Sequence, residues 1–350
     1  MAASDEASAA SNGAAERRPL LVTVVGPTAI GKTATAIAVA RALGTEIISS
    51  DSRQFYREIP IGTAQPTAAE RAAVPHHFVE FLSVREPYSS GRFEREALGF
   101  LDEFFSSGRA GADSPAGRPV AVMAGGSGLY VKAVHEGFDP MPSSDAVRAE
   151  LNAEAARGES GEGFAALLAE LERCDPEHFA LVDHLNTHRV IRALEVIRVS
   201  GKAYSSFRKQ AQEAVHHDAG GWSQSARRGF DTLTLGLGAQ REVLHERINA
   251  RTLAMLESGW VEETRNVMKI EGFEKLNALQ TVGYPPLFAH LRGELSLEEA
   301  TVRIQETTRQ FARRQLTWFH KVPNVHWLAF ESGPAQAVAL VQKFLRDGQL

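Results

Sequence analysis

A lysine and a threonine at the end of a glycine-bounded turn are the first residues whose spacing indicates chemistry. The turn Gly26-Pro27-Thr28-Ala29-Ile30-Gly31-Lys32-Thr33 matches the phosphate-binding pattern G-x-x-x-x-G-K-[ST] in full. The glycines let successive backbone N–H groups point at phosphate oxygens, and a helix that follows presents the positive end of its dipole to the same anion. Lys32 adds a mobile positive charge, and the Thr33 hydroxyl can hold Mg²⁺. The turn predicts a diphosphate or triphosphate site, for which ATP would be the default ligand.

An acidic residue follows the next apolar stretch. Residues 45–50 read as a second strand that ends at Asp51-Ser52-Arg53-Gln54. Open α/β sheets bind their ligands at the carboxyl ends of the strands. Asp51 could therefore hold Mg²⁺ or act as a general base beside the phosphate turn. The alternative is that Asp51 caps the next helix.

Two other short motifs contain polar side chains. Gly125-Gly126-Ser127 follows the apolar run 119–124, and glycines at the end of a strand let a ligand approach the backbone. The pair His76-His77 suggests a metal site, but adjacent side chains on a strand point to opposite faces. We therefore expect no metal there and place residues 74–78 in a surface loop.

The elements that must position these residues are strands and helices in alternation. Apolar strands are predicted at 20–25, 45–50, 119–124 and 232–237, with helices after the phosphate turn, at 88–105, at 241–257 and from 297 to about 320. This order predicts an α/β fold, a P-loop NTPase-like parallel sheet flanked by helices. Residues 136–207 have only helical periodicity, which predicts an inserted all-helical subdomain. The core domain would comprise residues 20–135 and 208–350, and residues 1–19 would be a disordered tail.

Two groups of arginines could contact a polyanion. Arg189 and Arg192 lie three residues apart and so on one helix face, which could also be an ordinary solvated face. The segment 303–321 has five basic residues against Glu306 alone, an excess that suits a phosphate-backbone site. Trp318 and Phe319, within this segment, are expected in the core.

Composition limits the class of protein. The chain of 350 residues is 43% hydrophobic and 23% charged, with a net charge of −5, so a nucleic-acid site would have to be a local basic patch. A single cysteine, Cys174, excludes a disulfide framework. The N-terminal stretch has no apolar signal segment, and no run is long enough to span a bilayer. We expect a cytoplasmic protein without a membrane partner.

Taken together, the motifs resemble those of the bacterial tRNA dimethylallyltransferase family over about residues 21–328. The matching segments are long and ordered: GPTAIGKT, SSDSRQFYREIPIGTAQPT, VPHHFVEF, EPYSSGRF, AGGSGLYVKAV, HRVIRALEV, RINARTLAMLESG, QTVGY and ARRQLTWF. The resemblance implies transfer of a dimethylallyl group from dimethylallyl diphosphate to N6 of adenosine 37, in tRNAs that read codons beginning with U. Mg²⁺ would be the cofactor, and the enzyme is expected to be a monomer.

The resemblance also implies roles for individual residues. The phosphate turn, with Lys32 and Thr33, would hold the diphosphate, and Arg251 would reach it from a later helix. Asp51 would be the general base. Ser127 stands where the family usually has threonine, and its hydroxyl would keep the catalytic role. The residues implied in contact with the tRNA anticodon stem-loop are Asp51, Ser52, Arg53, Gln54, Ser127, Arg148, His188, Arg189, Arg192, Gln280, Thr281, Val282, Gly283, Tyr284, Arg313, Arg314, Gln315 and Trp318.

Two departures and several alternatives remain at this stage. Leu253 stands where many members of the family have aspartate. Pro285-Pro286 follow the Gly-Tyr pair where the family usually has a basic residue and glutamate, so contacts after Tyr284 could differ. A P-loop small-molecule kinase would use the same turn for ATP. An adenylate isopentenyltransferase would use the same donor on a free nucleotide, but it has no need of the basic 303–321 segment. A non-catalytic RNA-binding switch would have no need of Asp51.

Overall fold

The computed structural model describes residues 18–138, 141–158, 161–207 and 228–348. Most of the predicted tail, residues 1–19, lies outside these ranges, as does the start of the predicted second core segment at 208. The chain folds into two compact units. Residues 1–136 and 221–350 form the first, and Gly137–Gly220 form the second, where 136–207 was the predicted insertion.

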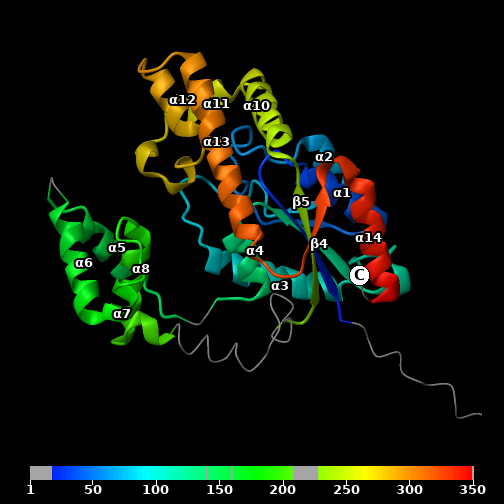
Figure 1. Ribbon diagram of the computed structural model, residues 1–350, viewed down its shortest axis with the longest axis horizontal. Coiled ribbons are helices and arrows are strands. Elements are labelled where there is room, and N and C mark those ends of the chain that lie inside the picture. The colour runs from blue at the N-terminus through cyan, green and yellow to red at the C-terminus, as the bar shows by residue number, and fades with distance from the viewer. Residues whose placement is uncertain (1–17, 139–140, 159–160, 208–227, 349–350) are drawn as a thin grey trace, which may run out of the picture. The chain divides into compact units, whose positions relative to one another are not determined.

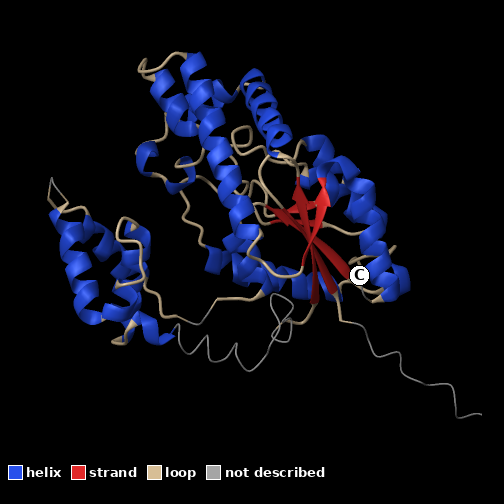
Figure 2. Cartoon of the chain, viewed as in Figure 1, coloured by secondary structure: helices blue, strands red, loops and turns tan. Residues whose placement is uncertain are grey.

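Six parallel strands form the sheet of the first unit (Figures 1 and 2). Their order across the sheet is β3-β2-β4-β1-β5-β6. The register pairs β1 with both β4 and β5, so the strand before the phosphate turn is central. The strands are β1 (Leu20–Val25), β2 (Ile47–Ser49), β3 (His76–His77), β4 (Val120–Gly125), β5 (Asp231–Gly238) and β6 (Val325–Ala329).

Helices cover both faces of this sheet. Between and after the strands lie α1 (Lys32–Leu43), α2 (Ala68–Ala73), α3 (Ser90–Ser106), α4 (Gly128–His135), α10 (Arg241–Glu257), α11 (Trp260–Val267), α12 (Tyr284–Leu291), α13 (Leu297–Phe319) and α14 (Gly333–Asp347). Short 3₁₀ turns are η1 (Pro115–Gly117), η3 (Phe273–Lys275), η4 (Asn277–Leu279) and η5 (Phe330–Ser332). The α/β fold with a parallel sheet flanked by helices is as predicted.

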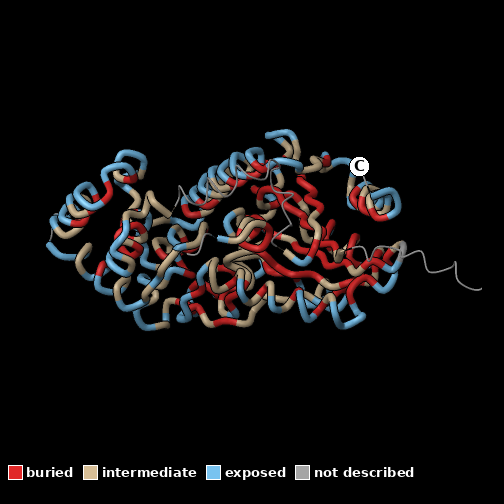
Figure 3. Tube along the Cα trace, turned by 90° about the horizontal axis from the view of Figure 1, so that it is seen from below, coloured by how far each residue is buried: buried red, intermediate tan, exposed pale blue. Residues whose placement is uncertain are grey.

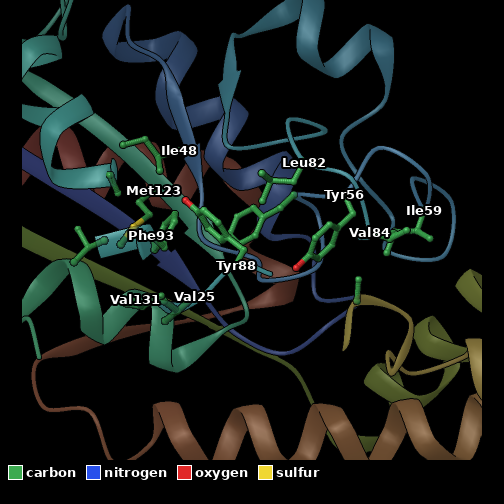
Figure 4. Packing of buried hydrophobic residues seen from close by; sticks show 14 of the residues in the cluster. Val25, Ile48, Tyr56, Ile59, Leu82, Val84, Tyr88, Phe93, Met123 and Val131 are labelled. Carbon is green, nitrogen blue, oxygen red and sulfur yellow. The ribbon is translucent and has the colours of Figure 1, made fainter. Parts of the chain in front are cut away.

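The side chains of β1 supply both layers of the core because successive residues point to opposite faces. Leu21 and Val25 belong to a cluster that contains residues of α3 and α4. Val22 and Val24 belong to a second cluster, with residues of α1 and α14. Figure 4 shows part of the first cluster, and Figure 3 shows that the strands are buried while the helices keep exposed outer faces. Burial on both sides explains why the strand is an unbroken apolar run.

Several local predictions were wrong. His76 and His77 form the edge strand β3, although residues 74–78 were predicted to be a loop. A strand of two residues is too short to show a pattern. Pro285 and Pro286, which depart from the family pattern, occupy the first turn of α12, where a missing backbone N–H costs nothing. No prediction included β6 or α14.

The regular elements described in the second unit are all helices. It contains α5 (Asp145–Ala155), α6 (Glu162–Cys174), α7 (Pro176–Phe179) and α8 (Thr187–Ser200). Leu151, Leu171 and Leu194 form the centre of its own hydrophobic cluster. This small core gives the unit a stable interior without the sheet.

Candidate active site

Three turns at the carboxyl edge of the sheet surround one cavity in the first unit. The phosphate turn follows β1, Asp51 follows β2, and the Gly125–Ser127 turn follows β4. These segments line a cavity of about 890 Å³, together with residues of α10 and α13. That volume suits a small organic ligand with part of a second one. The structure thus brings together the three motifs that the sequence singled out.

The phosphate turn has the backbone that an anion site requires. Gly26 has φ 145°, and a Cβ at this position would lie 2.7 Å from the carbonyl oxygen of Leu237. Only glycine fits there. Lys32 is the first residue of α1, so the helix N-terminus, whose first N–H groups have no intrahelical partner, opens at the turn. These groups and the helix dipole favour a bound phosphate.

Lys32 supplies a positive charge inside the cavity. Its ammonium donates a hydrogen bond of 2.7 Å to the carbonyl of Pro27. Burial is the main reason why the pKa of Lys32 is lowered to about 8; the charge of Asp51 opposes this shift, and the charge of Arg251 contributes to it. A bound diphosphate would therefore stabilise a charge that burial disfavours.

Two arginines one turn apart on α10 reach the phosphate turn. Arg251 donates a hydrogen bond of 3.4 Å to the Thr28 hydroxyl, and burial lowers its pKa. Arg247 donates from Nε to the carbonyl of Ala29 at 2.8 Å. Ala29 has φ 65°, a left-handed conformation unusual for alanine, so Arg247 supports a strained residue of the turn. Arg247 was not among the predicted site residues, although its spacing from Arg251 placed both on one face.

Asp51 lines the cavity on the side of β2. One carboxylate oxygen accepts the backbone N–H of Arg53 at 3.0 Å and closes a tight turn. The next helix is capped by Thr67 instead, so the helix-cap alternative for Asp51 is wrong. Asp51 shares the cavity with Lys32 and Arg251, and its negative charge acts to raise the pKa of both cations against the effect of burial. A carboxylate in this position can accept a proton or interact with a cation.

The serine after β4 positions the Asp51 turn. The Ser127 hydroxyl accepts the backbone N–H of Ser52 at 3.0 Å and lies 3.1 Å from the Ser52 hydroxyl. Gln54, whose amide contacts the Ser49 hydroxyl and the Ala64 carbonyl, fixes the other side of the same turn. The predicted residues Asp51 to Gln54 and Ser127 are therefore one connected group.

The segment 280–284 divides into exposed and buried parts. Gln280, Thr281 and Val282 line the cavity. Tyr284 is fully buried, and its hydroxyl donates to the Glu263 carboxylate at 2.6 Å. Gly283 is buried but lines a second, smaller cavity, so its predicted tRNA contact stays a prediction. Tyr284 is placed differently from the prediction, because its side chain is buried and anchors the segment from below.

Glu263 ties that anchor to a second loop. Its carboxylate also accepts the backbone N–H groups of Ile61, at 2.7 Å, and Gly62, at 2.9 Å. Burial raises the pKa of Glu263. Three donors on one buried carboxylate hold the 61–62 loop against Tyr284, and so two walls of the cavity are fixed to each other.

Helix α13 presents different side chains to the solvent and to the site. Arg313 and Arg314 are exposed, and Arg314 also lines the cavity. Phe319 is buried as predicted, but Trp318 is 40% exposed and lines the cavity, so its assignment to the core was wrong. Gln315 is buried, with its amide bonded at both ends to backbone of the site, which corrects its predicted role as a direct tRNA contact.

In the second unit, two predicted tRNA contacts are engaged in an internal ion-pair cluster. Arg148 and Arg192 both bind the carboxylate of Glu195, which is fully buried, at 2.9 Å. Arg192 also donates to the carbonyl of Pro142 at 3.0 Å. His188 and Arg189, in contrast, are exposed. Arg148 and Arg192 therefore hold this unit together. Because their charge is already paired with Glu195, they have less charge available for the RNA than predicted.

The cavity would suit an open Mg²⁺ site, completed by substrate and water, more than a metal site closed by protein ligands alone. Thr33 and Asp51 line it and offer hard oxygen ligands, and Mg²⁺ is commonly held by one or two such groups plus substrate phosphates and water. Within the described residues no group of three or more histidine, cysteine or acidic side chains could hold a metal ion. His77 pairs with Glu46 at 2.6 Å. Among the same residues no helix is long and apolar enough to cross a membrane.

Comparison with known proteins gives concordant matches. The family model described as IPP transferase matches residues 54–322, and that of isopentenyl transferase matches residues 20–86. A protein named tRNA dimethylallyltransferase from Christiangramia forsetii is 42% identical over 89% of this chain and 93% of its own length. One of the same name from Chloroherpeton thalassium is 38% identical over 92% of this chain and 93% of its own.

Solved structures are similar as well. The full-length tRNA isopentenylpyrophosphate transferase of Bacillus halodurans has a TM-score of 0.63 and 31% identity, covering 95% of this chain and 97% of that one. A eukaryotic dimethylallyltransferase acting on tRNA has a TM-score of 0.72 and covers 94% of this chain and 80% of that one. At 23% identity this second likeness concerns the fold alone. The P-loop NTPase-like class predicted for the sheet agrees with these neighbours.

Proposed function

Because this chain belongs to the IPP transferase family, we propose that it is a tRNA dimethylallyltransferase. It transfers the dimethylallyl group of dimethylallyl diphosphate to N6 of adenosine 37 in tRNAs that read codons beginning with U, and it releases diphosphate. The observation that carries this proposal is the placement of Lys32, Arg251 and Asp51 around one cavity. Cations that can stabilise a leaving diphosphate and a carboxylate that can accept a proton from the nucleophile then lie within one site.

The cationic side of the cavity stabilises the leaving group. As the bond between the allylic carbon and the diphosphate oxygen breaks, negative charge grows on the diphosphate. The N–H groups of residues 28–33 that face the ligand, with Lys32 and Arg251, are fixed before the reaction and need no rearrangement to meet that charge. Mg²⁺, held by the Thr33 hydroxyl with Asp51 in the same cavity, would neutralise further charge on the diphosphate.

Asp51 acts on the nucleophile. The lone pair of the adenine N6 amine is delocalised into the ring, so the amine loses a proton only as its new bond to carbon forms. The Asp51 carboxylate accepts that proton. Its hydrogen bond from the Arg53 N–H holds one oxygen and orients the group. The adenine must leave its stack to enter such a site, as in other enzymes that modify bases.

The RNA would lie along the outer surface of the same unit. Arg313 and Arg314 are exposed on α13, and Trp318 lies at the cavity wall, where an aromatic ring can stack on a base. In the second unit the exposed His188 and Arg189 would contact the anticodon stem. We further infer that the enzyme acts as a monomer in the cytoplasm.

The alternatives use the same phosphate turn. A small-molecule kinase would bind ATP there, and an adenylate isopentenyltransferase would accept free AMP. The exposed arginines of α13 favour RNA over a mononucleotide, because a mononucleotide contacts few phosphate-binding side chains outside the cavity.

The experiment compares three acceptors for one donor and includes a separate assay of ATP hydrolysis. Purified protein with Mg²⁺ and labelled dimethylallyl diphosphate is given an anticodon stem-loop with adenosines at 36, 37 and 38, the same stem-loop with guanosine at 37, or AMP. Label should enter the first acceptor alone. Transfer to AMP at an equal rate would favour the adenylate enzyme, and ATP hydrolysis without transfer to any acceptor would contradict the proposal.

A further inference from the structure

The side-chain amide of Gln315 connects α13 to two turns of the active site. Its Oε1 accepts the backbone N–H of Thr28 in the phosphate turn at 2.8 Å. Its Nε2 donates to the carbonyl of Gly126, in the turn after β4, at 2.9 Å. Gln315 is buried, so both bonds are shielded from water. A neutral side chain with both ends bonded to backbone fixes the spacing between those two turns.

The close fit at Gly126 shows how tightly the amide is held. A Cβ on Gly126 would overlap Nε2 of Gln315 and would lie 3.5 Å from Nζ of Lys32. One turn further along α13, Trp318 packs so close to Gly128 that a Cβ there would overlap its indole nitrogen. The same helix face therefore rests directly on the turn after β4, beside the ammonium that meets the diphosphate.

The neighbouring positions of the helix face outward. Arg313 and Arg314 precede Gln315 and are exposed, and they belong to the surface to which we assign RNA binding. A helix is stiff over one turn, so a restraint on the arginines also restrains Gln315. A ligand on the outer face and one in the phosphate turn are thus connected over a short distance through Gln315.

We propose that Gln315 is a positioning residue that couples RNA binding on α13 to diphosphate binding in the phosphate turn. RNA bound to the outer face restrains the helix, and the Gln315 amide carries that restraint to Thr28 and Gly126. The remaining motion of the turn is then already restricted when the diphosphate binds, so that binding costs less entropy. The inference rests on the proposed function, since it requires that RNA bind at α13.

Coupling of this kind is reciprocal, which allows it to be measured without catalysis. The probe is inorganic diphosphate with Mg²⁺, titrated by calorimetry into the protein alone and into the protein saturated with an anticodon stem-loop. We expect the RNA to lower the diphosphate Kd by a factor within the usual allosteric range of roughly 5–150-fold. The amide of Thr28 should also exchange its hydrogen more slowly when RNA is bound.

Two variants remove the link in different ways. Gln315→Met keeps the volume and removes both hydrogen bonds, and Gln315→Glu keeps an acceptor for Thr28 but has no donor for Gly126. In both, the ratio of diphosphate Kd values without and with RNA should fall toward one, while the Kd for RNA alone stays within about twofold because the arginines are intact. Gln336→Met, an exposed glutamine of α14, is the matched control and should keep the full ratio.

Three outcomes would overturn the proposal. An unchanged ratio in both variants would limit Gln315 to a local structural role, and weakened binding of RNA alone would return it to a direct RNA contact. A wild-type ratio of one would show that the two sites are independent. Failure of the proposed function is a separate result, namely no transfer from dimethylallyl diphosphate to the stem-loop, which leaves the measured ratio valid.

Discussion

The hydroxyl of Tyr284 donates a hydrogen bond of 2.6 Å to the Glu263 carboxylate, and both side chains are buried. The same carboxylate accepts the backbone N–H groups of Ile61 and Gly62. The pair therefore lies beneath two loops that line the cavity, and it holds them without contacting a ligand itself. Loss of this pair should therefore lower the stability of the protein directly and affect activity only through the two loops that it holds.

Replacement of Tyr284 by phenylalanine should destabilise the protein. The change removes one hydrogen bond to a buried carboxylate and leaves its two backbone donors, so we expect a loss of about 1.5–3 kcal/mol in the free energy of unfolding. Denaturant unfolding of Tyr284→Phe, Glu263→Gln and the double variant gives the coupling between the two side chains. Additive effects would show that the hydrogen bond contributes nothing of its own.

The alkaline limb of the pH–activity profile, where activity falls as the pH rises, should report the loss of charge on Lys32. Its pKa is lowered to about 8 by burial, so the ammonium is present below that pH and is lost as the pH rises through it. The value of kcat/KM for dimethylallyl diphosphate should therefore fall above about pH 8, since this parameter follows the free enzyme. In Lys32→Arg the charge persists, and the limb should move well to higher pH. An unmoved limb would assign it to another group.

The same shift has a consequence for stability, with the opposite sign. Because folding lowers the pKa of Lys32 from 10.5 to about 8, the unfolded chain binds more protons than the folded one in this interval. The free energy of unfolding should therefore rise with pH between these values, by the contribution of this one group. A Lys32→Met variant should lack that rise, which thermal unfolding over the same pH range would show.

Asp51→Asn tests the general base with little change in geometry. Asparagine keeps the oxygen that accepts the Arg53 N–H, so the turn should be retained. The amide cannot take a proton from N6, and kcat should fall by roughly 10²–10⁴-fold while the stem-loop binds as before. Single-turnover transfer and RNA binding should be measured on the same preparation. Turnover at the wild-type rate would remove Asp51 from its role.

The sequence alone was sufficient where function depends on local spacing. The phosphate turn, Asp51 and the turn before Ser127 each lie directly after a strand, and parallel strands deliver their carboxyl ends to one edge. Nothing more than chain order was needed to place them together. The strand β6 and helix α14 were missed because β6 is only half-buried and has no clear pattern, and its pairing with β5 comes from the fold.

Contacts between side chains that are distant in the sequence could not be predicted in the same way. Arg148 and Glu195 are 47 residues apart, and only the packing of α5 on α8 shows that the arginine is paired. Gln315 follows two exposed arginines, and whether it faces solvent or the site depends on how α13 is rotated against the turn after β4. Tyr284 is likewise placed by its tertiary contact with Glu263. Charge and residue type predicted which residues form an RNA-binding surface. Burial in the folded chain determines which of those residues are exposed on it.

The contrast between exposed and paired arginines gives the last prediction. Arg313→Ala removes an exposed charge of α13, so it should weaken stem-loop binding and reduce the slope of log Kd against log salt by about one. Arg192 instead donates to Glu195 and to the Pro142 carbonyl. Arg192→Ala should leave that slope nearly unchanged and destabilise the second unit, because Glu195 keeps its burial and loses one of its partners.

The two variants serve as controls for each other, since each removes one arginine. RNA binding is measured by fluorescence anisotropy over a salt series, and the stability of the second unit by proteolysis at its helices. An unchanged salt slope in Arg313→Ala would mean that this arginine is not in contact with phosphate. A slope reduced equally in Arg192→Ala would mean that the Glu195 cluster opens to bind RNA, and that its arginines exchange the buried carboxylate for phosphate in the complex.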